Sequence, residues 1–116
     1  MKTGKMRRRI LVVLGTRPEA IKLAPVVQEL GRRRGTFHCA LCVTSQHREM
    51  LAPMLRFFGL EPKYDLDVMR PAQALGELTG RVLAGLDRVL EAENPDWVVV
   101  QGDTTTAMAA ALAAFY

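Results

Sequence analysis

Two basic side chains, Arg17 and Lys22, follow directly on a short apolar segment and are the first residues that could do chemistry. The segment at 10–14 consists of five consecutive apolar residues and ends at Gly15. Such a run is typical of a strand that is buried on both faces of a parallel sheet. Ligands of open α/β sheets bind at the carboxyl ends of the strands, where these two cations would lie. Arg17 and Lys22 are therefore candidates for binding an anion or a nucleotide.

The turn after this strand also has the signals of a helix start. Thr16 and Glu19 have the spacing of a capping box, and Pro18 suits the first turn of a helix. Free backbone N–H groups at such a helix end favour a bound anion, which supports a phosphate site. The turn lacks the G-x-G-x-x-G and P-loop patterns of nucleotide-binding loops. An ordinary strand–helix turn with a surface arginine therefore remains the alternative.

Two further polar turns contain side chains that could act on the same ligand. Residues 44–49 include Gln46 and His47, and residues 101–106 include Asp103 and three threonines. Each turn follows a strand-like segment, so a parallel sheet would bring both of them to the edge where the first turn lies. We expect the three turns to converge there. The alternative for Asp103 is helix capping, since Asp is a favoured N-cap residue, and for His47 it is a surface position at a helix start.

The chain as a whole alternates between strand and helix signals. We expect a strand at 10–14, a helix at 18–34, a strand at 37–44, a helix from the turn after 44 to 58, a strand at 64–68, a helix at 71–93, a strongly buried strand at 97–101 and an alanine-rich helix from there to 116. This alternation predicts an α/β fold with a parallel sheet, helices on both faces and right-handed crossovers. The expected strand order is third, second, first, fourth, which is one Rossmann-like half of a doubly wound sheet.

Composition and charge exclude several classes of protein. Apolar residues make up 49% of the 116 residues and charged residues 24%, which is typical of a globular domain. The net charge of +4 arises in the N-terminal tail, and the rest of the chain has 11 basic against 12 acidic residues. The tail charges are those of Lys2, Lys5, Arg7, Arg8 and Arg9. We therefore predict no nucleic-acid partner. No apolar segment approaches the ~18 residues of a membrane span, so we also predict no membrane partner and a cytoplasmic location.

The two cysteines, Cys39 and Cys42, have the C-x-x-C spacing of redox and metal sites. They lie, however, in a strand-like segment, in which residues three apart point to opposite faces of the sheet. The sequence contains no second cysteine pair. We therefore interpret both cysteines as core thiols and predict no metal site and no cofactor.

The three polar turns resemble, one after another, the motifs of a known enzyme family. The string GTRPEAIK at 15–22 is similar to the opening motif of the non-hydrolysing UDP-N-acetylglucosamine 2-epimerases. The string TSQHREML at 44–51 resembles their second motif, and QGDTTT at 101–106 resembles their Gly-Asp-Thr motif. The resemblance extends from about Arg9 to Tyr116, with the motifs in register throughout.

The resemblance implies a fold, a reaction and a set of site residues. The family has the two-domain GT-B fold, of which this chain would form part of the N-terminal domain. Its members interconvert UDP-N-acetylglucosamine and UDP-N-acetylmannosamine by eliminating UDP, which leaves a 2-acetamidoglucal, and adding it back with C2 inverted. By matching position, Arg17 and Lys22 belong to the substrate-binding residues, and Asp103 belongs both to these and to the catalytic carboxylates. Gln46 and His47 match a site that binds regulatory UDP-N-acetylglucosamine in some members.

The same resemblance predicts that the chain is a fragment of a longer enzyme. We expect a disordered basic tail at 1–8 and an incomplete N-terminal Rossmann-like domain at 9–116, without the second GT-B domain. The fragment alone is expected to be inactive, and the full-length enzyme is expected to be a homo-oligomer, a dimer, that serves polysaccharide biosynthesis. The alternatives are another GT-B enzyme, such as a nucleotide-sugar glycosyltransferase, and a stand-alone phosphate- or nucleotide-binding module.

Overall fold

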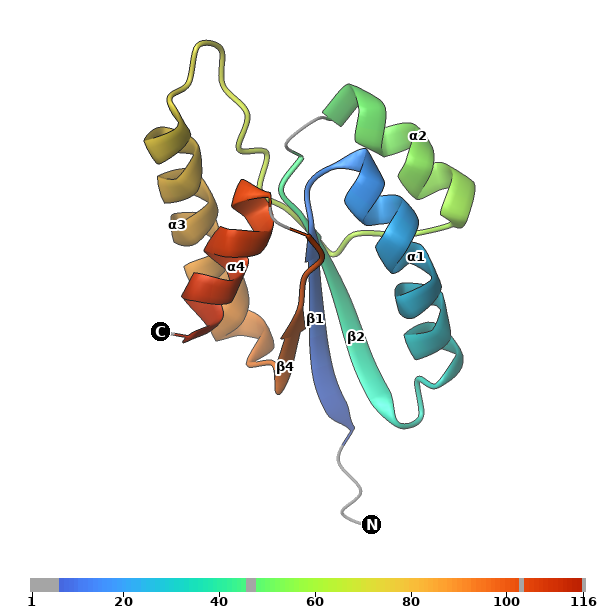
Figure 1. The fold of residues 1–116 in the computed structure, drawn as a ribbon. Helices are drawn as coiled ribbons and strands as arrows, with labels where there is room; N and C mark the ends of the chain where they lie inside the picture. Colours follow the sequence, from blue (N-terminus) through green and yellow to red (C-terminus); the bar gives the residue numbers. More distant parts are fainter. Residues whose placement is uncertain (1–6, 46–47, 103, 116) are drawn as a thin grey trace.

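A four-stranded parallel β-sheet lies between two pairs of helices (Figure 1). The structure is a computed structural model that describes residues 7–45, 48–102 and 104–115. Its elements are, in chain order, β1 (Arg8–Leu14), α1 (Arg17–Arg32), β2 (Phe37–Val43), α2 (Arg48–Phe58), β3 (Tyr64–Asp65), α3 (Leu75–Glu93), β4 (Trp97–Val99) and α4 (Thr105–Phe115). The strands lie in the order β3-β2-β1-β4, and all neighbours are parallel. The predicted Rossmann-like fold and strand order are confirmed.

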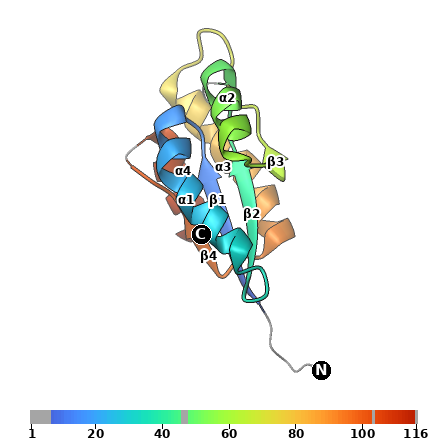
Figure 2. The same cartoon turned by 90° about the vertical axis from the view of Figure 1, so that its right-hand side faces the viewer.

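The core consists of two apolar layers, one on each face of the sheet. Ile10, Val12 and Leu14 of β1 belong to the layer beneath α1 and α2, the face that Figure 2 looks onto. Leu11 and Val13 belong to the layer beneath α3 and α4 on the opposite face. Successive side chains of a strand point to opposite faces, so a sheet covered on both faces requires the unbroken apolar run that β1 provides.

The two cysteines occupy opposite faces of β2, as the strand period predicts. Cys42 is buried in the layer beneath α3 and α4, whereas Cys39 is half-buried on the side of α1 and α2. Both are free thiols. Burial, assisted by the negative charge of Asp65, raises the pKa of Cys42 to about 12 and so disfavours its reactive thiolate. The structure therefore supports the interpretation of Cys42 as a core thiol.

The third strand is shorter than predicted. β3 covers only Tyr64 and Asp65, whereas the sequence predicted a strand at 64–68. The reason is a local turn: the Asp65 carboxylate accepts a hydrogen bond from the N–H of Asp67 at 3.0 Å, and Asp67 has a left-handed φ of +49°. Aspartate favours such turns because its side chain bonds the backbone two residues further on. The chain therefore leaves the sheet after Asp65.

The third helix begins later than predicted. The sequence predicted a start at Pro71, but Ala72 has a left-handed φ of +54° and α3 begins at Leu75. The Glu77 carboxylate accepts the N–H of Ala74 at 2.9 Å, which fixes the first turn. Among the described residues, no helix has both the length and the apolar character that crossing a bilayer requires.

The fourth strand is shorter and more exposed than predicted. β4 covers Trp97–Val99 rather than 97–101, and within the described part of the chain its strand neighbour is β1 alone. Trp97 is 65% exposed, while Val98 and Val99 are half-buried. The prediction of a strongly buried strand is therefore wrong for this chain, because β4 forms an edge of the sheet and only one of its sides is paired.

The amino edge of the sheet is tied to α3 by one buried carboxylate, that of Glu93, which is 3% exposed. Lys63 Nζ and Tyr64 OH both donate to its Oε2 at 2.6 Å. His38 Nε2 and Arg9 Nη2 both lie 3.3 Å from its Oε1. Burial alone would raise the pKa of Glu93, but the hydrogen bonds from Lys63, Tyr64 and His38 outweigh it and lower this pKa to about 2. The five side chains, the Glu93 cluster, join the end of α3 to β1, β2 and β3.

Of the predicted tail at 1–8, residues 1–6 lie outside the described residues. Arg8 begins β1 and its N–H donates to the carbonyl of Thr36 at 3.0 Å. Arg9 is the next residue of β1 and, through the Glu93 cluster, is part of the folded sheet. Arg8 and Arg9 therefore belong to the folded sheet.

Candidate functional site

The loops at the carboxyl edge of the sheet are joined by hydrogen bonds between side chains. Thr104, in the loop between β4 and α4, donates its hydroxyl to Glu19 in the first turn of α1. Thr106, at the start of α4, has its hydroxyl 3.0 Å from that of Thr44, the residue after β2. The loops after β1, β2 and β4 therefore meet at one edge of the sheet, as the sequence predicted.

Glu19 connects two of these loops through both oxygens of a carboxylate that is 2% exposed. Its Oε1 accepts the N–H of Gly15 at 2.7 Å and the N–H of Thr16 at 3.1 Å, the contact expected of a capping box. Its Oε2 accepts the hydroxyl of Thr104. Sequence reasoning assigned Glu19 to capping and missed this second role, because the spacing of a capping box says nothing of a partner 85 positions away. The one available signal was the expected convergence of the two loops.

The hydrogen bond between Glu19 and Thr104 lies at the topological switch point of the sheet, between β1 and β4. From β1 the chain continues into α1 on one face, and from β4 it continues into α4 on the other face (Figure 1). In open α/β sheets, the carboxyl ends of two strands whose helices diverge in this way enclose a crevice that binds ligands. The place between the carboxyl ends of β1 and β4, called the crevice below, is therefore where this topology predicts a ligand, and it is the candidate site.

Arg17 and Lys22 are both exposed at the start of α1, beside this crevice. Arg17 is the first residue of the helix, at the end where the helix dipole favours an anion. Lys22 follows Glu19 by three residues and therefore shares its flank of α1. Within the described residues, neither cation takes part in an ion pair.

The predicted site residue Asp103 lies outside the described residues, but both of its neighbours are described. Gly102 has a left-handed φ of +84°, a conformation that glycine adopts without strain. On the other side, Thr104 Oγ1 accepts the N–H of Ala107 at 3.2 Å, which caps the first turn of α4. Thr104 therefore acts as a cap of α4.

The predicted effector residues Gln46 and His47 also lie outside the described residues. The preceding Ser45 has a left-handed φ of +57°, and its hydroxyl donates to Asp65 at 2.6 Å. The carbonyl of Thr44 accepts the N–H of Val68 at 3.0 Å. The end of β2 is therefore tied to the segment that follows β3, and this contact fixes where the turn at 44–49 leaves the sheet.

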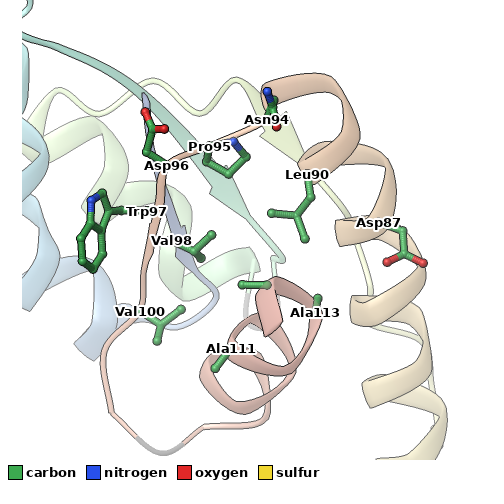
Figure 3. A pocket seen from close by; sticks show the side chains of 11 residues that line it. Asp87, Leu90, Asn94, Pro95, Asp96, Trp97, Val98, Val100, Ala111 and Ala113 are labelled. Atoms are coloured by element: carbon green, nitrogen blue, oxygen red, sulfur yellow. The ribbon is translucent and has the colours of Figure 1, made fainter. Parts of the chain in front are cut away.

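A separate hollow lies outside the β4 edge, between α3 and α4 (Figure 3). Its apolar lining includes Leu90, Val98, Val100 and Ala113, and polar side chains such as Asp87 border it. It shares no residue with the three polar turns in the described part of the chain. Since the hollow offers no convergent cations or hydroxyls, the crevice between β1 and β4 remains the candidate site.

The sheet order and the helices that diverge to opposite faces define a Rossmann-like α/β domain. The sequence model of the family described as UDP-N-acetylglucosamine 2-epimerase matches residues 28–116. The chain therefore belongs to the UDP-N-acetylglucosamine 2-epimerase family, as the motif resemblance predicted.

Individual relatives and solved structures agree with this family. The UDP-N-acetylglucosamine 2-epimerase of Yersinia pestis is 55% identical over 108 residues, which are 93% of this chain and 28% of the relative. The crystal structure of UDP-GlcNAc 2-epimerase from Neisseria meningitidis bound to UDP-GlcNAc matches with a TM-score of 0.85 at 51% identity, over 93% of this chain and 29% of that chain. A structure of a putative UDP-N-acetylglucosamine 2-epimerase from Listeria monocytogenes matches with a TM-score of 0.89 at 49% identity, over 96% of this chain and 29% of that chain.

The chain thus spans about 29% of the length of the proteins that it matches. Its sheet corresponds to part of a GT-B fold, as predicted. The similarity favours the epimerase family over the two alternatives, a nucleotide-sugar glycosyltransferase and a stand-alone binding module.

Proposed function

We propose that this chain forms one wall of the active site of an enzyme that interconverts UDP-N-acetylglucosamine and UDP-N-acetylmannosamine. In this proposal Arg17 and Lys22 bind the substrate, and Asp103 both binds it and acts in catalysis. The observation that supports the proposal most directly is the hydrogen bond between Glu19 and Thr104. It joins the loop that bears Arg17 to the loop in which Asp103 follows β4 in sequence.

The proposed reaction is an elimination followed by an addition. A base removes the proton from C2 of the sugar, the electrons of that C–H bond form a double bond between C1 and C2, and the C1–O bond breaks to release UDP. UDP then adds back to C1 while C2 receives a proton on its opposite face. Such chemistry needs a carboxylate for proton transfer and cations that stabilise the negative charge of the departing diphosphate. Asp103 supplies the first, and Arg17 and Lys22 supply the second.

Four further parts of the proposal concern the full-length enzyme. Gln46 and His47 bind UDP-N-acetylglucosamine as an effector, in addition to its role as substrate. The enzyme is a homodimer, it works in the cytoplasm, and it needs no metal or other cofactor. Because the chain spans about 29% of its relatives, it is expected to be inactive by itself.

The experiment is a turnover assay on the full-length protein that carries this segment. NMR should show conversion of UDP-N-acetylglucosamine to UDP-N-acetylmannosamine. Arg17→Ala should weaken the affinity for UDP by about 10- to 100-fold along with turnover, because it removes a charge-assisted contact to an anion. Arg56→Ala, at an exposed position near the end of α2, is the matched control and should leave both unchanged. A wild-type protein without turnover, or an Arg17→Ala variant equal to the control, contradicts the proposal.

A further inference from the structure

We infer that Glu19 and Thr104 form a positioning pair that fixes the two walls of the crevice between β1 and β4 relative to each other. Glu19 lies in the first turn of α1 and Thr104 precedes α4, so their hydrogen bond connects elements on opposite faces of the sheet. The inference rests on the proposed function, because the loops that it joins contain Arg17 and Asp103. Neither Glu19 nor Thr104 needs to touch the substrate for this role.

The contacts of Glu19 exceed those that helix capping requires. A capping box needs one hydrogen bond from the N-cap N–H to the acid, which here is the bond from Thr16 at 3.1 Å. Glu19 accepts two more, from the N–H of Gly15 at 2.7 Å and from the hydroxyl of Thr104. A carboxylate that is 2% exposed depends on such donors, because a buried charge without partners is costly. Loss of the Thr104 donor should therefore disturb the other two contacts.

Hydroxyl groups join the start of α4 to other elements. The side of α4 that packs toward β1 and α3 consists of small residues, among them Ala109, Ala110 and Ala113. Such side chains offer little interlocking that would fix the helix along its axis. Hydroxyl groups at its first turn contact other elements of the described chain, from Thr104 to Glu19 and between Thr106 and Thr44 at 3.0 Å. The first of these joins the β4–α4 loop to α1, so in this inference it sets the separation of the two sides of the crevice.

The width of the crevice should affect turnover more than substrate affinity. Reacting atoms must lie about 3–3.5 Å apart in a productive complex, and a misplacement of about 1 Å can cost roughly 10²-fold in rate. Without the Thr104 hydroxyl, the distance between Arg17 and Asp103 would no longer be fixed by a hydrogen bond. Both of these side chains would still be present to bind the substrate. We therefore expect kcat to fall by about 10- to 100-fold, with a smaller change in KM.

Three variants of the full-length protein test this expectation. Thr104→Val removes the hydroxyl at nearly constant shape, and Thr104→Ser keeps a hydroxyl. Thr79→Val is the matched control, because it removes a threonine hydroxyl that donates to the carbonyl of Leu75 within α3, at 2.9 Å. Turnover should fall in Thr104→Val, be largely kept in Thr104→Ser and remain unchanged in Thr79→Val. An equal kcat in Thr104→Val and Thr79→Val overturns the inference.

Amide hydrogen exchange separates positioning from simple capping of α4. Thr104→Val also removes the cap on the Ala107 N–H, and a capping defect alone would speed exchange only within α4. If Thr104 holds Glu19, the amides of Gly15 and Thr16 on the other loop should exchange about 10-fold faster as well. Unchanged exchange at these two amides overturns the inference. A wild-type protein that lacks epimerase activity contradicts the proposed function instead, and the exchange result then decides the inference by itself.

Discussion

Replacing Glu93 with glutamine should destabilise the chain at neutral pH and make its stability less sensitive to acid. Glu93 is 3% exposed, and its carboxylate oxygens contact Lys63, Tyr64, His38 and Arg9. Glutamine keeps the size of the side chain and one acceptor oxygen but removes the negative charge. The contacts with Lys63 and Arg9 would then lose their ionic character inside the fold.

The size of the effect follows from the pKa of Glu93, which is about 2 in the fold against 4.5 for an ordinary glutamate. Burial opposes ionisation of this carboxyl, but the hydrogen bonds from Lys63 and Tyr64 outweigh it. Because the folded state has the lower pKa, ionised Glu93 stabilises the fold above pH 4.5, and this stabilisation is lost as the pH falls toward 2. The difference corresponds to about 3 kcal/mol at neutral pH, of which roughly 2 kcal/mol is lost by pH 3.

The assay is equilibrium unfolding of the chain in urea at pH 7 and at pH 3. Glu93→Gln should be less stable than wild type by up to about 3 kcal/mol at pH 7, and the gap should narrow to about 1 kcal/mol at pH 3. Glu91 is exposed on the same helix, so Glu91→Gln is the control. Its free energy of unfolding should equal that of wild type at both pH 7 and pH 3. A gap between wild type and Glu93→Gln that is the same at pH 7 and pH 3 would refute the electrostatic reasoning.

Three further predictions concern a thiol, the sheet edge and the isolated chain. Cys42, buried and with a pKa of about 12, should react with a thiol reagent far more slowly than Cys39 until the chain unfolds; equal rates in the native protein would contradict this. The chain should self-associate through the exposed edge of β4, and Trp97→Lys should weaken this association; a monodisperse wild-type monomer in sedimentation at high concentration would count against it. The isolated 116-residue chain should not turn over UDP-N-acetylglucosamine, and proton exchange at C2 in its presence would disprove this.

The order of the elements could be predicted from the sequence because their signals are local. The apolar run of β1 identifies a strand that is buried on both faces. In α3, an apolar stripe at helical spacing identifies a helix with one buried face; it consists of Leu78, Val82, Leu86 and Val89. Alternation of strands and helices, with right-handed crossovers, then leaves few arrangements of the sheet. The convergence of the three polar turns follows from that arrangement, and two contacts confirm it, between Thr44 and Thr106 and between Thr104 and Glu19.

The features that could not be predicted depend on partners that are distant in sequence or on what borders an element. The end of β3 depends on the turn between Asp65 and Asp67, and the exposure of Trp97 depends on the edge position of β4. The spacing of Thr16 and Glu19 predicted a cap, but no local pattern indicates that Glu19 also accepts the hydroxyl of Thr104. For the same reason, nothing in the sequence near Glu93 pointed to its four partners, three on strands and Lys63 just before β3.

The most direct test of the proposed function is deuterium incorporation at C2 of the substrate by the full-length protein and its Asp103→Asn variant. The wild type should incorporate deuterium from the solvent while it interconverts the two nucleotide sugars. Asn caps a helix about as well as Asp, so a purely structural Asp103 would leave kcat nearly unchanged. If Asp103 acts in proton transfer, Asp103→Asn should lower kcat by about 10²- to 10⁴-fold while UDP binding survives. A near wild-type kcat in Asp103→Asn would contradict its catalytic role.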